Sequence, residues 1–299
     1  MKCLFFCSFV YDYWFWKKYK YLLKKWRPMS MSREHGKLII IGGNEDKNND
    51  CEILKSFIEM AGKDKAKLAV IPTATKEGQV TGETYQDLFY SLGAESVEIL
   101  YVNSRRDANK TEVMEKLQNS TGVFFTGGDQ LRITSLLGGT RIDWLLHEIY
   151  SQGVIISGTS AGAAAITDTM IMEGIDESAP AKNSVALAHG LGFLKGAVVD
   201  QHFAERGRIG RLLSAVAQNP VVTGMGIDEN TAIVVDKDDQ IEILGTGTVT
   251  IIDGKEIEET NISQEDDNSP LALTNVTVDI LSPGSRFDLK KRNLSLQGG

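Results

Sequence analysis

Cysteine is scarce in this chain of 299 residues and occurs only at positions 3, 7 and 51. No C-x-x-C or Cys/His ligand spacing is present, so we expect neither a disulfide framework nor a zinc site. A dinucleotide fingerprint is also missing, because Gly42-Gly43-Asn44 does not satisfy the G-x-G-x-x-G pattern. Histidine occurs four times, which leaves few candidates for a general base. The sequence therefore predicts chemistry that needs no metal or organic cofactor.

Linker-like runs and internal repeats are absent between residues 37 and 285, so we expect one catalytic domain over 31–299. The chain is 42% hydrophobic and 24% charged, which is ordinary for a globular protein. Its net charge of -8 and the lack of a large basic cluster disfavour nucleic-acid binding. We expect a cytoplasmic protein without a membrane partner; a homodimer stays open, because the sequence does not determine the oligomeric state.

The first thirty residues differ sharply in composition from the rest. They hold three of the four tryptophans and a net charge of +6, which leaves about -14 for the remainder. The basic residues follow the apolar run, and Asp12 interrupts it, so neither a signal peptide nor a membrane span is indicated. We expect residues 1–30 to be a non-native or disordered extension, with the true start at Met31 or Met29. An aromatic and basic anchor on a membrane surface stays open.

One serine occupies a position typical of a catalytic nucleophile. Residues 158–162 read Gly-Thr-Ser-Ala-Gly and follow the apolar run 153–156. A G-x-S-x-G pattern between a buried strand and a small-residue helix is typical of a nucleophile elbow. The flanking glycines suit a turn that leaves no room for a Cβ, and the Ala161 N–H can donate to an oxyanion. Ser160 is the predicted nucleophile, with helix capping as the alternative.

A serine nucleophile needs a base and an acid that orients the base. His202 follows the apolar stretch 197–201, and catalytic groups gather at the carboxyl ends of strands in open α/β sheets. His189, in a glycine-bounded loop, stays an alternative. His35 and His147 have no site around them.

The acid and a second oxyanion donor are expected at other strand ends. Asp228 and Glu229 both follow the apolar stretch 224–227, and the residues alone do not choose between them. Residues 126–130 read Thr-Gly-Gly-Asp-Gln, and paired glycines let the backbone approach a ligand with an unhindered N–H. Gly128 is therefore the expected second donor, facing Ala161.

Apolar runs and amphipathic stretches alternate from residue 37 onward. We expect strands at 38–41, 67–71, 96–101, 123–126 and 154–157, and helices at 53–61, 82–92, 111–118, 129–137, 141–151 and 161–166. This alternation predicts an α/β fold whose mostly parallel sheet is covered by helices on both faces. Strands at 231–235, 240–244 and 246–252 indicate an antiparallel extension near the C-terminus. The segment 173–190 contains Pro180 and many small polar residues, and we expect a long loop there.

Taken together, these motifs resemble those of the serine peptidases related to aspartyl dipeptidase (peptidase E) and cyanophycinase. The resemblance covers residues 37–285 and rests on T-G-G-D-Q at 126–130, G-T-S-A-G-A at 158–163, D-Q-H-F at 200–203 and G-I-D-E at 226–229. The stretch 200–212 is closer to cyanophycinase than to the dipeptidases. The resemblance implies a fold like that of class I glutamine amidotransferases, although those enzymes use a cysteine nucleophile.

The resemblance also implies roles for individual residues. Ser160 would be the nucleophile, His202 the general base and then acid, and Glu229 the orienting acid. The implied substrate contacts are Gln130, Asp200, Gln201, Arg206, Arg208 and Arg211. The implied reaction is exopeptidase cleavage of cyanophycin, a poly-aspartate chain with arginine on each β-carboxylate, to β-aspartyl-arginine dipeptides.

Three arginines suit such a substrate. Arg208 and Arg211 are three residues apart in a helix expected to begin near Gly207, and Arg206 lies just before it. We expect the three to hold substrate α-carboxylates and Asp200 to meet substrate guanidinium groups. A solvated basic helix face is the alternative.

Two other functions stay open at the level of the sequence. An aspartyl dipeptidase would cleave small peptides and ignore the polymer, and a non-catalytic binding module could use the same scaffold. The order Ser, His, Glu along the chain argues against an α/β-hydrolase, in which the acid precedes the histidine.

Overall fold

The computed structural model describes residues 35–176, 179–263 and 269–295, all within one compact unit, His35–Gly299. The extension expected at residues 1–30 lies outside the described residues, so that hypothesis stays a prediction. Among the helices of the described residues, none is long and apolar enough to cross a membrane.

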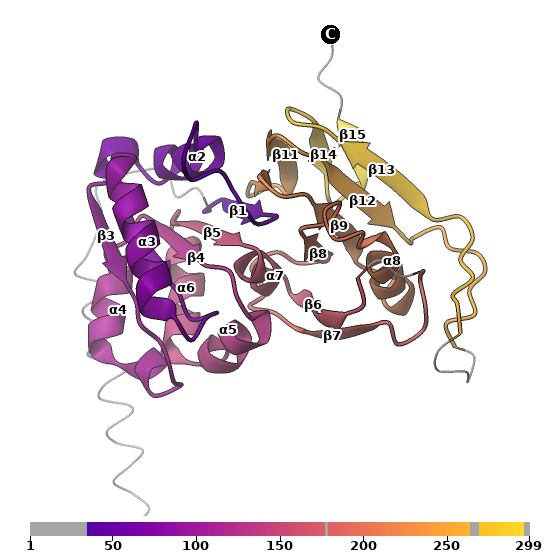
Figure 1. The fold of residues 1–299 in the computed structure, drawn as a ribbon, viewed down its shortest axis with the longest axis horizontal. Coiled ribbons are helices and arrows are strands. Elements are labelled where there is room, and N and C mark those ends of the chain that lie inside the picture. Colours follow the sequence, from indigo (N-terminus) through magenta and orange to yellow (C-terminus); the bar gives the residue numbers. More distant parts are fainter. Residues whose placement is uncertain (1–34, 177–178, 264–268, 296–299) are drawn as a thin grey trace, which may run out of the picture. The chain divides into compact units, whose positions relative to one another are not determined.

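The largest sheet has nine strands in the order β15-β14-β11-β10-β1-β5-β4-β2-β3 (Figure 1). Five neighbouring strands are parallel: β1 (Leu38–Ile41), β5 (Ile155–Thr159), β4 (Gly122–Phe125), β2 (Lys67–Ile71) and β3 (Ser96–Ile99). Beyond β1 the sheet continues antiparallel through β10 (Thr231–Val235), β11 (Gln240–Gly245), β14 (Arg286–Asp288) and β15 (Asn293–Ser295). The predicted α/β fold with a largely parallel central sheet is confirmed.

Helices bury both faces of this sheet. Successive residues of a strand point to opposite faces, and the four residues of β1 divide between two hydrophobic cores. One core includes α2 (Glu52–Met60) and α3 (Gly78–Ser91). The other includes α4 (Thr111–Gln118), α5 (Gln130–Leu137), α6 (Arg141–Tyr150) and α7 (Ala161–Ile166). Burial on both faces explains why the parallel strands read as continuous apolar runs.

A second sheet has four strands in the order β13-β12-β9-β8. Strands β8 (Ala197–Gln201) and β9 (Thr223–Ile227) are parallel and are separated in the chain by α8 (Ile209–Gln218). Strands β12 (Val249–Asp253) and β13 (Thr277–Leu281) continue it antiparallel. The predicted extension is therefore divided between two sheets, because β12 pairs with β9 and not with β11.

The prediction of a long loop over 173–190 is wrong at the two ends of that segment, which belong to strands. Strands β6 (Thr169–Gly174) and β7 (Val185–His189) form an antiparallel pair there. Met170 and Ile171, just before the segment, and Val185 within it are buried in this pair. Pro180 and the small polar residues are confined to the connection between the two strands.

Candidate active site

The nucleophile elbow lies where β5 ends and α7 begins. Ser160 is the single residue between them and has φ 53° and ψ -113°, a backbone conformation that non-glycine residues rarely adopt. Close packing explains the flanking glycines. A Cβ on Gly158 would lie 2.6 Å from the Gly162 carbonyl oxygen, and one on Gly162 would lie 2.5 Å from the Phe125 oxygen. Glycine at 158 and 162 therefore lets β5, α7 and β4 pack closely around the turn that contains Ser160.

His202 lies beside this serine, directly after β8. The Ser160 hydroxyl and His202 Nε2 are 2.9 Å apart, which is hydrogen-bond distance. His202 also has a left-handed backbone, with φ 49°, and its N–H donates to the Gly42 carbonyl at 2.8 Å. A Cβ on Gly43 would come within 2.5 Å of Nε2, so the glycine leaves the space that the imidazole ring occupies. Strained backbone at two neighbouring residues is typical of functional sites.

Glu229 completes a chain of hydrogen bonds from the serine. Its Oε1 lies 2.7 Å from His202 Nδ1, and its Oε2 accepts a bond of 2.7 Å from the Asn44 amide. The Asn44 bond, helped by His202 and opposed by burial, holds the pKa of Glu229 below its ordinary value of 4.5. An ionised Glu229 can accept a hydrogen bond from Nδ1–H, which fixes the tautomer of His202 in which Nε2 is free to take the proton of Ser160.

Asp228, the other candidate acid, faces a different way. Its carboxylate accepts bonds from the Thr248 N–H and hydroxyl, at 2.9 and 2.7 Å, and from the Ala204 N–H at 3.1 Å. These bonds tie together the segments after β8 and before β12. Of the two adjacent carboxylates, only Glu229 contacts the His202 ring.

The Asn44→Ala variant tests the Asn44–Glu229 bond through the pH dependence of stability. Because the folded-state pKa of Glu229 is lowered, its stabilising contribution is complete above the unfolded-state pKa and is lost as the pH falls through the folded-state pKa. Without Asn44 the folded-state pKa of Glu229 should lie closer to its unfolded-state pKa. The variant should be less stable than the wild type at about pH 7, and the difference should shrink below about pH 4.

Urea denaturation across this range measures the effect, with Asn48→Ala as a control on the same exposed loop. A stability difference that stays constant with pH would contradict a role for Asn44 in setting the pKa of Glu229.

The glycine pair after β4 lies against Ser160. A Cβ on Gly127 would be 3.3 Å from the Ser160 Cβ, and one on Gly128 would be 2.5 Å from the Ala74 carbonyl oxygen. Gly128 has φ 141°, which favours glycine. Ala161 is the first residue of α7, where backbone N–H groups are not used within the helix. Both expected oxyanion donors are therefore on segments that adjoin Ser160.

A buried ion cluster lies just before the histidine. Asp200, with no exposed surface, accepts bonds from Arg211 at 2.6 and 2.5 Å, and Arg208 lies 3.3 Å away. Burial raises the pKa of Asp200, although both guanidinium groups favour its charged form. On the more exposed side, Asp176 accepts from Arg208 Nε at 2.9 Å and from Arg211 at 3.1 Å. The two arginines are thus held between a buried carboxylate and a partly exposed one. Contrary to expectation, Asp200 has no exposed surface with which to meet substrate guanidinium groups, because its two oxygens face Arg208 and Arg211.

The other predicted contact residues lie in different surroundings. Arg206 is exposed and does not join the ion cluster; its charge instead helps to lower the pKa of Glu229. The Gln130 amide donates to the carbonyls of Ile171 and Met172 in β6, at 2.9 and 3.0 Å. Gln201 is buried, and its carbonyl accepts a bond of 2.6 Å from Arg208.

Asn44 and Asp176 are parts of the site that sequence reasoning missed. Asn44 follows a glycine pair at the end of the first strand, and that position was a usable signal, because carboxyl ends of parallel strands meet at one edge of a sheet. No comparable sequence feature marked Asp176, because it lies in the connection between β6 and β7 and not at the end of a parallel strand.

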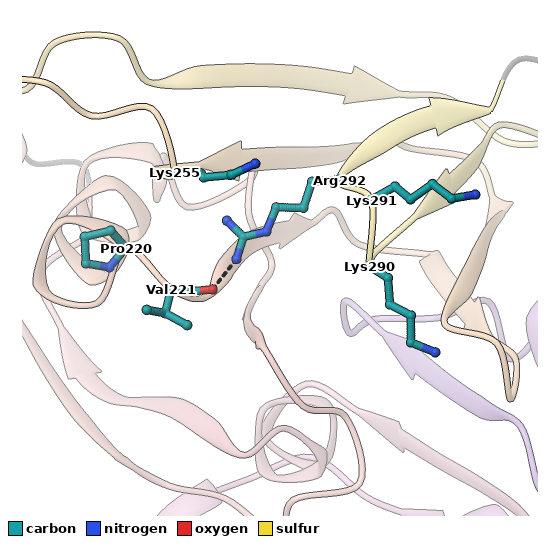
Figure 2. A pocket seen from close by; sticks show the side chains of 6 residues that line it. All are labelled: Pro220, Val221, Lys255, Lys290, Lys291 and Arg292. Atoms are coloured by element: carbon teal, nitrogen blue, oxygen red, sulfur yellow. Dashed lines mark hydrogen bonds between the residues drawn. The ribbon is translucent and has the colours of Figure 1, made fainter.

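A pocket of about 440 Å³ lies elsewhere on the surface and is lined by Pro220, Val221, Lys255, Lys290, Lys291 and Arg292 (Figure 2). Arg292 donates to the Val221 carbonyl and pairs with Asp253 at 2.6 Å. Lys290 and Lys291 also have carboxylate partners, at 2.9 and 3.1 Å. No residue of the Ser-His-Glu chain lines this pocket, so we assign it no part in the site.

Known proteins resemble this chain over most of its length. The model of peptidase family S51 matches residues 38–244. The cyanophycinase of Synechococcus elongatus is 40% identical over 260 residues, which cover 87% of this chain and 81% of that protein. The cyanophycinase of Trichormus variabilis is 41% identical over 258 residues, which cover 86% of this chain and 87% of that protein.

A crystal structure of a peptidase from an acI-B1 Actinobacterium has the same fold, with a TM-score of 0.60 at 22% identity, over 82% of this chain and 97% of that chain. The family match spans both the elbow and the His202 and Glu229 segments, and two relatives agree with it at about 40% identity. The chain therefore belongs to peptidase family S51 and is a serine-type peptidase.

Proposed function

We propose that this peptidase is an exopeptidase that hydrolyses the poly-aspartate backbone of cyanophycin to β-aspartyl-arginine dipeptides. The observation that carries the proposal is the continuous hydrogen-bonded chain from Ser160 through His202 to Glu229, with spacings of 2.9 and 2.7 Å. The choice of substrate is supported by the similarity to proteins named cyanophycinase.

In the proposed mechanism, the Ser160 oxygen attacks an aspartyl peptide carbonyl while His202 Nε2 takes the hydroxyl proton. Glu229 accepts the Nδ1 hydrogen bond and stabilises the imidazolium. The N–H groups of Gly128 and Ala161 donate to the oxyanion. His202 then protonates the leaving amine, and water, activated by the same ring, hydrolyses the acyl-enzyme. Every proton is thus carried by one histidine, and no cofactor takes part in the proposal.

Substrate binding is assigned to the ion cluster and its neighbours. Asp176 bonds to two arginines with a partly exposed carboxylate, so a substrate α-carboxylate of the same shape fits these guanidinium groups. Arg208 and Arg211 would receive the carboxylate, and Asp200 would keep both side chains in place. Gln130, Gln201 and Arg206 complete the proposed contact set.

Further expectations belong to the same proposal. We assign the fold to the class I glutamine amidotransferase-like type, residues 31–299 to a single catalytic domain, and the protein to the cytoplasm. Cyanophycin is the proposed partner, and a homodimer is the assembly to be tested.

Incubation with insoluble cyanophycin tests this proposal. Mass spectrometry of the soluble fraction should detect β-aspartyl-arginine dipeptides. A parallel incubation with small aspartyl dipeptides distinguishes the alternative activity. Cleavage of the dipeptides with the polymer left unchanged would replace the proposal with an aspartyl dipeptidase, and no cleavage of either would favour a non-catalytic binding module.

A further inference from the structure

The end of β1 and the loop that follows it contact the backbone or side chains of all three residues of the Ser-His-Glu chain. The Ile41 carbonyl accepts the Ser160 N–H at 3.0 Å, and the Gly42 carbonyl accepts the His202 N–H at 2.8 Å. The Asn44 amide bonds to Glu229. These contacts join β5 of the large sheet to the ends of β8 and β9 in the small sheet.

The next residue of this loop is a buried glutamate. The Glu45 side chain is only 1% exposed. Its Oε2 accepts a bond of 2.5 Å from the Thr159 hydroxyl, and its Oε1 accepts from the Tyr85 hydroxyl and lies 2.9 Å from Lys47 Nζ. Burying a carboxylate is costly unless its oxygens are bonded and its charge is paired. Both kinds of partner are present at Glu45, since hydroxyl groups donate to its two oxygens and Lys47 supplies the opposite charge.

Thr159 immediately precedes the nucleophile. Ser160 has an unfavourable left-handed backbone, and such strain persists only where the surroundings fix it. The Thr159 side chain cannot shift without breaking its bond to Glu45, which restrains the peptide that leads into Ser160. We propose that Glu45 is a positioning residue that acts through Thr159 to hold the Ser160 hydroxyl in line with His202. This inference rests on the proposed role of Ser160 as nucleophile.

If Glu45 only stabilised the fold, its loss would lower stability more than reactivity at Ser160. The backbone of Thr159 is already aligned with Ile41 by strand pairing, so the sheet does not need the Glu45 bond to form. Loss of that bond should therefore affect the geometry of the nucleophile more than the stability of the fold. A misplacement of about 1 Å at a reacting group can cost roughly 100-fold in rate.

The test measures how fast a fluorophosphonate labels Ser160, because this reaction needs the activated serine and no natural substrate. Thr159→Val removes only the hydroxyl, and Glu45→Gln removes the charge. Each should lower the second-order labelling rate by up to roughly 100-fold. The double variant should be little slower than either single variant, because both changes act on the same hydrogen bond, which Glu45→Gln weakens and Thr159→Val removes. Thr159→Ser retains the hydroxyl and should recover most of the rate.

Thr140→Val is the matched control, since Thr140 is a buried threonine whose hydroxyl bonds to the Leu137 carbonyl away from the site. It should lower the urea midpoint without lowering the labelling rate. Labelling of Thr159→Val and Glu45→Gln at the rate of the control, or additive losses in the double variant, would overturn the inference. If Glu45→Gln does not fold, the comparison of Thr159→Val with Thr159→Ser still decides. A wild-type protein that is not labelled at Ser160 would instead contradict the proposed nucleophile.

Discussion

Replacing Ser160 with alanine should lower the rate of peptide hydrolysis by about 10⁶-fold at saturating substrate, because the acyl-enzyme can no longer form. The protein should still fold, since the Ser160 side chain bonds to His202 but caps no helix. His202→Ala should be similarly impaired, and the double variant should be no worse, because residues of such a chain act as one unit. Hydrolysis rates with dipeptide release as the readout test both expectations.

Ser157→Ala is the matched control for this prediction. Ser157 lies three residues earlier, in β5, is fully buried, and its hydroxyl has no hydrogen-bond partner among the described residues. Its removal should leave hydrolysis at the wild-type rate. Substantial activity in the Ser160→Ala variant would rule out the proposed nucleophile.

Replacing Asp200 with asparagine should lower the free energy of unfolding by about 3–5 kcal/mol, because two buried guanidinium groups lose their buried counter-charge. Asp200 has no exposed surface, and the side chains of Arg208 and Arg211 are 5% and 6% exposed. Asparagine has nearly the same shape as aspartate, so the loss reflects charge more than packing. Urea denaturation measures the difference.

Asp176→Asn is the matched control, because this carboxylate bonds to the same arginines from a position that is 38% exposed. Solvent weakens such a pair, and we expect a loss of no more than about 1 kcal/mol. Equal losses in the two variants would show that burial does not decide the strength of this cluster.

The strand–helix alternation up to residue 166 could be predicted because each signal is local. The strands at 38–41 and 67–71 and the helices at 111–118 and 161–166 have the predicted bounds. An apolar run bounded by glycine or polar residues depends on its own neighbours alone.

The second sheet could not be predicted in the same way. Whether β12 pairs with β9 or with β11 depends on contacts between distant segments. Gly226 shows one such contact, since a Cβ there would lie 2.4 Å from the Phe203 ring. The sequence shows the glycine but not the aromatic ring that lies against it.

The sequence indicated which strand ends hold the candidate site residues, but not the direction and partners of each side chain. Asp228 and Glu229 follow the same strand, and successive residues of an extended chain point to opposite sides. Which of them faces His202 therefore depends on how β9 lies against β12, where Thr248 bonds to Asp228. The spacing of Arg208 and Arg211 indicated that their side chains lie close together. The bonds that Asp176 makes to both of them could not be predicted, because they depend on how β6 and β7 pair.

Ser160 follows a strand of the nine-stranded sheet, while His202 and Glu229 follow strands of the four-stranded sheet. During synthesis the ribosome releases the segment with the serine well before the segment with the glutamate. A nascent chain that ends before residue 229 lacks the proposed orienting acid, and one that ends within residues 249–253 lacks a complete β12, which pairs with β9. If the three residues act as proposed, we expect peptidase activity to appear only after the segment with Glu229 has emerged and folded.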